Sequence, residues 1–165
     1  MAVSSQKISV LVLGIGNLVM SDDAVGVIVA QRLQQDYRFP DNVEIMDGGT
    51  LGLDLLPKLE NITNLIVIDA VETGQKTGTC VRLCGEELPI ALETKVSPHQ
   101  MGLKDLLAVS ALMGHSPKEM VLIGVQPGSI EMDVGLTGEV EAKLEILVSN
   151  VLTELTDWGI EVTPC

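Results

Sequence analysis

Aromatic residues are nearly missing from this sequence: 165 residues include one Trp, one Tyr and one Phe, or 2%. The hydrophobic content is nevertheless 46%. The core must therefore be built from Val, Leu, Ile, Ala and Met, which suit strands buried on both faces and the helices that cover them. A chain of this length is most economically one domain, spanning residues 1–165, and it needs no disulfide to hold its core together.

Basic residues are also scarce. The sequence has 10 Lys and Arg against 23 Asp and Glu, a net charge of −13 at pH 7. Contacts with phosphate need clustered Lys and Arg, so this balance argues against nucleic acid and against an anionic membrane surface. It allows a partner with exposed basic residues, through electrostatic steering. An acidic surface that only keeps the protein in solution explains the charge equally well.

Cysteine and long apolar runs are limited too. Cys80 and Cys84 are four positions apart on an expected strand, and Cys165 is the last residue, so neither a disulfide framework nor a Cys-x-x-Cys zinc site is expected. A thiol protease is disfavoured, because no helix N-terminus is expected near Cys80 or Cys84 to lower the pKa of a thiol. No apolar run reaches the roughly 18 residues of a membrane span, and residues 1–7 lack a secretory signal pattern. We therefore expect a cytoplasmic protein.

The rest of the sequence alternates short apolar runs with segments of helical periodicity. We expect parallel strands at 8–13, 43–46, 65–68 and 120–125, and helices at 22–36, 51–59, 100–113 and 138–158. Residues 79–84 follow a glycine-rich turn with no helix before them, which is typical of an antiparallel edge strand. The pattern predicts an α/β fold: a three-layer sandwich around a mostly parallel twisted sheet with one antiparallel edge strand.

Two carboxylates follow strands of this expected sheet. If the strand at 8–13 lies between those at 43–46 and 65–68, the sheet has a switch point, where ligands bind beyond the carboxyl ends of the strands. Asp23 follows the first strand and Asp69 ends the third. A carboxylate at the end of a buried strand is costly unless it is paired or ligated. We therefore expect Asp23 and Asp69 to line one crevice.

His99 supplies a possible third ligand, in the segment Ser97-Pro98-His99-Gln100. Two carboxylates and one imidazole make an O,O,N site for a borderline metal such as zinc or nickel. A loop histidine with no such role is the alternative. Asp22 lies about 100° from Asp23 around the helix, so only one of them can face the crevice. For Asp22 we expect only a helix N-terminus role, with Ser21 as the capping residue.

Two other motifs carry less weight. Gly14-Ile15-Gly16-Asn17 resembles a dinucleotide fingerprint, but position 19, where the third glycine belongs, is Val19. A tight turn is the better explanation of these glycines. The chain has no Gly-x-Ser-x-Gly element, which disfavours Ser-His-Asp catalysis. His115 lies in an expected surface turn and is given no role.

Four segments together resemble the signature segments of the nickel-iron hydrogenase maturation endopeptidases, in order along nearly the whole chain. They are GIGNLVMSDDAVGV, EIMDGGTLGLDLL, LIVIDAV and KVSPHQMGLKDLL. The resemblance implies that Asp23, Asp69 and His99 bind a metal ion, and that Asp47, Gly48 and Gly49 take part in cleavage or substrate recognition. The first ligand is Glu in some members, so Asp23 is a shorter variant. Ala24 stands where many members have Gly.

The function implied by this resemblance is removal of a C-terminal extension from a nickel-iron hydrogenase large-subunit precursor, after nickel insertion. Either a metal held by the protein polarises a carbonyl or activates water, or the three residues contact nickel that the precursor already carries. We expect the second, because two carboxylates and one imidazole form a weak site, so the free protein should hold no metal tightly. Asp47 is the candidate base of an aspartyl-type endopeptidase. We expect a monomer, and a non-catalytic nickel-checking chaperone is the alternative.

Overall fold

The computed structural model describes residues 8–49, 55–88 and 103–165. The main sheet contains β1 (Val10–Ile15), β3 (Val43–Gly49), β4 (Asn64–Ala70), β5 (Cys80–Cys84) and β6 (Glu119–Val125). The helices are η1 (Ser21–Ala24), α1 (Val25–Asp36), α2 (Leu56–Glu60), α4 (Leu103–Leu112), α5 (Gly138–Glu141) and α6 (Leu144–Asp157). A separate antiparallel pair joins β2 (Tyr37–Arg38) to β7 (Thr163–Pro164). No helix of the described residues is long and apolar enough to cross a membrane.

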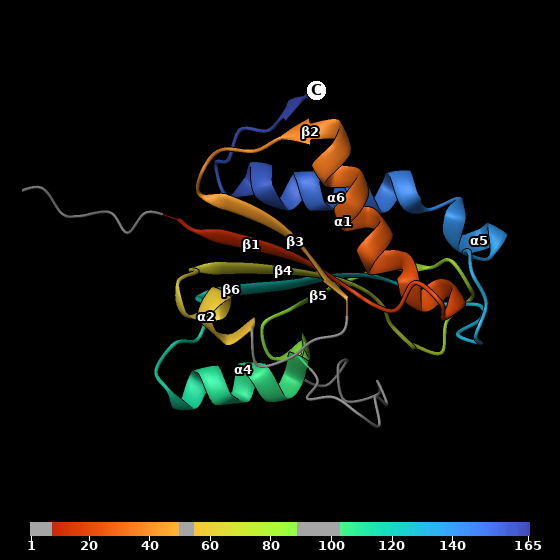
Figure 1. Ribbon diagram of the computed structural model, residues 1–165, viewed down its shortest axis with the longest axis horizontal. Coiled ribbons are helices and arrows are strands. Elements are labelled where there is room, and N and C mark those ends of the chain that lie inside the picture. Colours follow the sequence, from red (N-terminus) through yellow and green to blue (C-terminus); the bar gives the residue numbers. More distant parts are fainter. Residues whose placement is uncertain (1–7, 50–54, 89–102) are drawn as a thin grey trace, which may run out of the picture.

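The strand order is β3-β1-β4-β6-β5. β1 pairs in parallel with β3 on one side and β4 on the other, so the expected switch point between β1 and β4 is confirmed. β5 pairs antiparallel with β6 at the edge of the sheet, as expected. In Figure 1, α1 and α6 lie on one face of the sheet, and α2 and α4 lie on the other. The predicted three-layer sandwich is confirmed.

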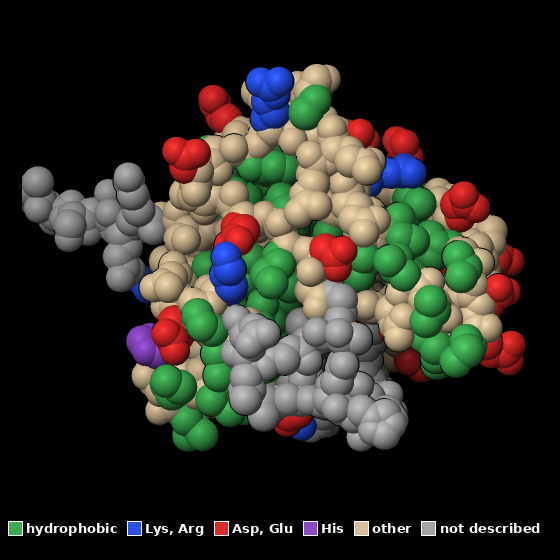
Figure 2. All heavy atoms as spheres, in the orientation of Figure 1, with side chains coloured by type: hydrophobic (Ala, Val, Ile, Leu, Met, Phe, Trp, Pro, Cys, Tyr) green, Lys and Arg blue, Asp and Glu red, His purple; other side chains and the backbone are tan. Residues whose placement is uncertain are grey.

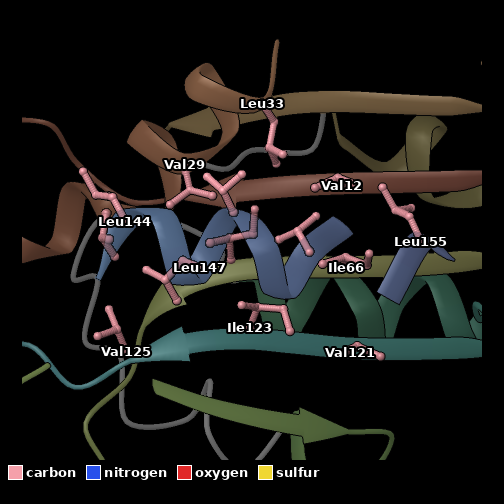
Figure 3. Close-up of a cluster of buried hydrophobic side chains, with 14 of the residues drawn as sticks. Val12, Val29, Leu33, Ile66, Val121, Ile123, Val125, Leu144, Leu147 and Leu155 are labelled. Carbon is pink, nitrogen blue, oxygen red and sulfur yellow. The ribbon is translucent and has the colours of Figure 1, made fainter. Parts of the chain in front are cut away.

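Each face of the sheet has its own hydrophobic core, because successive residues of a buried strand point to opposite faces. On the α1 and α6 face, Val12 and Ile66 pack with Leu147 (Figure 3). On the α2 and α4 face, Leu13 and Val67 belong to the other core. Burying one such aliphatic side chain is worth about 1.5–3 kcal/mol. Among the described residues, every large side chain that is fully buried is Leu or Ile, which agrees with the scarcity of aromatics.

Several expected boundaries were wrong. The expected helix 22–36 is a 3-10 helix, η1, followed by α1. The expected strand 43–46 continues through Asp47 and Gly48 to Gly49, because pairing with β1 carries on there and outweighs the low strand propensity of Asp and Gly. The expected single helix 138–158 is two helices, α5 and α6. Its predicted apolar stripe is nevertheless buried throughout: Val140, Leu144, Leu147, Val148, Val151 and Leu155.

Candidate functional site at the carboxyl ends of β1, β3 and β4

The register of the sheet brings the predicted carboxylates to one edge. Gly14 of β1 pairs with Asp47 of β3 on one side and with Ile68 of β4 on the other. Asp69 is the next residue of β4. Asp47 and Asp69 therefore lie at the same end of the sheet, on either side of β1.

Glycines allow the start of α1 to lie directly against this edge. A Cβ atom on Gly26 would stand 2.1 Å from the carbonyl oxygen of Ile68, and one on Gly14 would stand 2.1 Å from the carbonyl oxygen of Gly26. No side chain fits at either position, so the backbones of α1, β1 and β4 approach one another as only glycine permits. The GIG and AVG elements of the sequence thus have a packing role.

Asp23 is held by the turn between β1 and η1. Gly16 has a φ of +142°, and a Cβ there would lie 1.8 Å from the carbonyl oxygen of Asp23. The backbone N–H of Asn17 donates to Asp23 Oδ2 at 3.0 Å. Asp23 is half-buried, and its helix η1 contacts β4. The turn therefore places Asp23 beside the strand that carries Asp69.

Asp69 is completely buried, with 0% of its surface exposed. Its Oδ1 accepts a hydrogen bond from the backbone N–H of Ala70 at 2.8 Å. Along β4, Asp69 alternates with Leu65 and Val67, both of which belong to the core under α2 and α4. Asp69 therefore points toward the layer that contains α4.

Asp47 lies on the other face of the sheet. Its Oδ2 accepts a hydrogen bond from Gln31 Nε2 of α1 at 3.2 Å. The β1–β3 register skips Gly48, since Gly14 pairs with Asp47 and Ile15 pairs with Gly49. Such a bulge redirects side chains and is common beside active sites. Asp47 is thus at the same edge as Asp69 but is directed toward α1.

His99 lies outside the described residues, so its meeting with Asp23 and Asp69 stays a prediction. Within residues 8–49, 55–88 and 103–165, no three His, Cys, Asp or Glu side chains form a group that could hold a metal. In the sequence, His99 precedes Leu103, the first residue of α4, by four positions. His115 is exposed in the turn after α4.

Asp22 is the residue whose role the sequence did not disclose. It is 0% exposed, and its carboxylate accepts hydrogen bonds from the backbone N–H groups of Gly128 (2.7 Å), Ser129 (3.1 Å) and Thr137 (2.8 Å). The hydroxyl of Thr137 also donates to it at 2.8 Å. Asp22 therefore ties η1 to the segment between β6 and α5, and the expectation of a simple helix-terminus role was wrong. No local signal could reveal this, since the partners are 106 to 115 positions away.

The expected Ser21 cap was also wrong. Ser21 has a φ of 51°, and η1 has no side-chain cap hydrogen bond. Its hydroxyl donates instead to the carbonyl oxygen of Glu131 at 2.8 Å. The Ser21 hydroxyl therefore bonds to the segment after β6 and is not available for a local helix cap.

Two side chains of β5, Arg82 and Cys80, have raised pKa values. The guanidinium of Arg82 donates to the carboxylate of Glu154, which is 5% exposed, and this hydrogen bond raises the pKa of Arg82. Burial raises the pKa of the Cys80 thiol, although the Lys143 ammonium opposes the effect. A raised pKa keeps a thiol in its unreactive protonated form. The structure thus agrees with the exclusion of thiol catalysis at Cys80.

Comparison with known proteins identifies the family. The family model described as hydrogenase maturation protease matches residues 27–154. The hydrogenase 2 maturation protease of Escherichia coli (strain K12) is 43% identical over 94% of this chain and 95% of its own length. This chain belongs to the hydrogenase maturation protease family. It is therefore an endopeptidase, as the resemblance implied.

Solved structures agree with this assignment. The hydrogenase maturating endopeptidase HybD from E. coli superposes with a TM-score of 0.89 at 42% identity, covering 95% of this chain and 98% of that one. A [NiFe] hydrogenase maturation protease, HycI from Thermococcus kodakarensis KOD1, superposes with a TM-score of 0.73 at 27% identity, covering 92% and 95%. The α/β fold described above is thus the fold of this protease family.

Proposed function

We propose that this chain removes the C-terminal extension of a nickel-iron hydrogenase large-subunit precursor in the cytoplasm, after nickel has been inserted. The supporting observation is the placement of Asp23 and Asp69 at the switch point between β1 and β4, in a chain of the maturation protease family. Water adds to the scissile carbonyl carbon, the C–N bond breaks, and the products are a carboxyl group and an amine.

In this proposal, Asp23, Asp69 and His99 contact nickel that the precursor carries. Carboxylate oxygens and an imidazole suit a borderline metal, and three ligands leave coordination positions that the precursor's own ligands complete. Asp69 is fully buried, and burial strengthens the attraction between a carboxylate and a nearby cation, so contact with nickel there is favourable. Contact with the nickel would make binding, and therefore cleavage, depend on a loaded precursor.

Asp47, Gly48 and Gly49 are proposed to bind the extended segment of the precursor. They form the end of an edge strand, and a bulge at Gly48 leaves backbone that another chain can approach closely. Asp47 remains the candidate base. Its direction toward α1, away from the face of Asp69, favours substrate binding over removal of a proton from a water beside Asp69.

The test is a processing assay with purified precursor, in which cleavage appears as a shift in the mobility of the large subunit on a gel. Nickel-loaded and nickel-free precursor are compared, using protein treated with a chelator that is then removed. Cleavage of the loaded precursor alone supports the proposal, and equal cleavage of both contradicts the nickel contact. Binding without any shift would identify the chain as the nickel-checking chaperone instead.

An Asp47→Asn variant separates the two roles of Asp47. A higher KM with little change in kcat indicates substrate binding, because that pattern follows the loss of contacts made equally in the ground state and the transition state. A fall in kcat of a hundredfold or more, about the lower bound for general base catalysis, indicates the base.

A further inference from the structure

Exposed hydrophobic side chains gather beside the proposed site. In the described residues, the large hydrophobic side chains that are exposed number eight, and five of them come from two short segments. They are Leu18 (47% exposed), Val19 (47%), Ile130 (57%), Met132 (82%) and Val134 (79%). We call these five residues the apolar platform. Figure 2 shows hydrophobic side chains clustered on the right of the view, where η1 and α5 lie in Figure 1.

The two segments of the apolar platform are joined through their backbones. Met20 and Asp133 form a parallel bridge, and the N–H of Asp133 donates to the carbonyl oxygen of Val19 at 3.0 Å. The N–H of Ser21 donates to the carbonyl oxygen of Asp133 at 2.9 Å. Together with the hydrogen bonds that the buried Asp22 carboxylate accepts from Gly128 and Ser129, these backbone bonds hold the two segments side by side. A surface that is already ordered loses little conformational entropy when a partner binds.

The apolar platform is continuous with the proposed nickel contact. Asn17, one position before Leu18, donates its N–H to the Asp23 carboxylate at 3.0 Å. Its side-chain oxygen accepts from the N–H of Val19 at 3.0 Å. A protein bound to the apolar platform would therefore lie next to Asp23.

The two chain segments that carry the apolar platform have acidic side chains and no basic ones. Residues 14–31 and 124–142 contain no Lys or Arg. Within the second segment, Glu131 and Asp133 alternate with the platform residues, and both are exposed. Figure 2 shows acidic side chains along the outer edge of the cluster. The complementary surface is apolar at its centre with Lys or Arg at its rim.

We infer that the apolar platform docks the folded body of the hydrogenase large-subunit precursor, through an apolar patch of the precursor rimmed by Lys or Arg. This inference rests on the proposed function and deepens it: Asp23, Asp69 and His99 would contact the nickel, and the platform would bind the protein around it. An exposed apolar cluster of this kind marks an interaction surface in a water-soluble protein. The acidic rim would speed encounter with a basic partner and make it depend on salt.

The experiment measures the affinity of purified precursor for variants made in the Asp69→Asn background, in which we expect no cleavage during binding. The platform variant is Met132→Ser/Val134→Ser. The matched control is Leu112→Ser, at the end of α4 and 89% exposed. All of these side chains are exposed, so the melting temperatures should stay unchanged. We expect the platform variant to bind at least tenfold more weakly and the control to stay within twofold.

A Glu131→Lys variant tests the rim, and we expect several-fold weaker binding that recovers as salt is raised. Tighter binding by Glu131→Lys, equal affinity of the platform variant and the control, or no binding of precursor by the parent protein overturns the inference. Light scattering in parallel tests self-association. A dimer of the parent protein that the platform variant converts to a monomer would assign the surface to a second copy of this chain, and would overturn it as well.

Processing by the protein with Asp69 intact separates the two proposals. If the precursor binds through the platform but is never cut, the proposed function fails and the docking surface stands. If the precursor is cut and the platform variant has the KM of the wild type, the docking surface fails and the function stands. Support for both requires a KM raised about tenfold with kcat within twofold, because a remote contact contributes uniform binding.

Discussion

Replacing Asp22 should destabilise the protein strongly, although its neighbour Asp23 is the proposed ligand. The Asp22→Ala variant leaves four donors without their acceptor: three backbone N–H groups and the Thr137 hydroxyl. A buried donor left unpaired costs about 1–3 kcal/mol. Gly128 and Ser129 are partly accessible, so water can satisfy some of the lost bonds, and the lower value is appropriate. Four donors at about 1 kcal/mol each lower the free energy of unfolding by roughly 4 kcal/mol.

Two further variants show how much of this loss of stability comes from each kind of hydrogen bond to Asp22. Asp22→Asn keeps one acceptor oxygen but turns an NH₂ group toward donors, so we expect a loss of about 2 kcal/mol. Thr137→Val removes only the hydroxyl and leaves the backbone N–H bonds to Asp22 in place, so we expect about 1 kcal/mol. We expect the loss to fall in the order Asp22→Ala, Asp22→Asn, Thr137→Val, because each variant keeps more of the hydrogen bonds to residue 22 than the one before it.

The measurement is equilibrium unfolding in urea with the slope of the transition checked for each variant, since an altered slope would mean a changed unfolded or native state. An Asp22→Ala protein within about 1 kcal/mol of wild type would refute the claim that this carboxylate organises the loop. Equal losses for Asp22→Ala and Thr137→Val would show that the backbone N–H bonds contribute nothing.

Three more outcomes are expected. Gly26→Ala should lower the free energy of unfolding by more than about 3 kcal/mol and abolish processing, because its Cβ would stand 2.1 Å from the backbone of β4. The control Gly138→Ala, whose Cβ would have nothing within 4 Å, should fold normally. Equal melting temperatures of the two variants would contradict this prediction. Asp69→Asn should keep the fold by circular dichroism but lose precursor processing, and wild-type processing would remove Asp69 from the site. In native protein, the raised pKa of Cys80 should make its alkylation slower than that of exposed Cys165 across pH 7–9. Mass spectrometry follows the two rates. Faster labelling of Cys80 would contradict the claim that burial raises its pKa.

Sequence periodicity was sufficient for the layers of the fold and for the antiparallel edge strand β5, but not for the full order of the sheet. Apolar runs of strand length alternate with helical stripes, and the stripe from Val140 to Leu155 is buried throughout, as its spacing requires. The switch point was predicted only on the condition that β1 lies between β3 and β4, one of the few arrangements allowed for parallel strands joined by helices, and the structure meets that condition. Asp69 could be identified from the sequence because it ends an apolar run, and the burial of a residue in a central strand follows from that strand.

Contacts between distant segments were beyond the reach of the sequence. Asp22 and Asp23 are adjacent and chemically identical, yet they bond to different parts of the chain. Asp22 accepts four hydrogen bonds from residues more than 100 positions away. Asp23 accepts a hydrogen bond from Asn17 in its own turn. The bulge at Gly48 and the extension of β3 to Gly49 depend on pairing with β1. The sequence by itself determined which residues are apolar, which turns need glycine and where each strand ends in a carboxylate, because these depend on neighbours along the chain. Only the tertiary structure decided which carboxylate is a structural anchor and where the apolar platform forms, because a hydrogen-bond acceptor is chosen by the donors that packing brings to it.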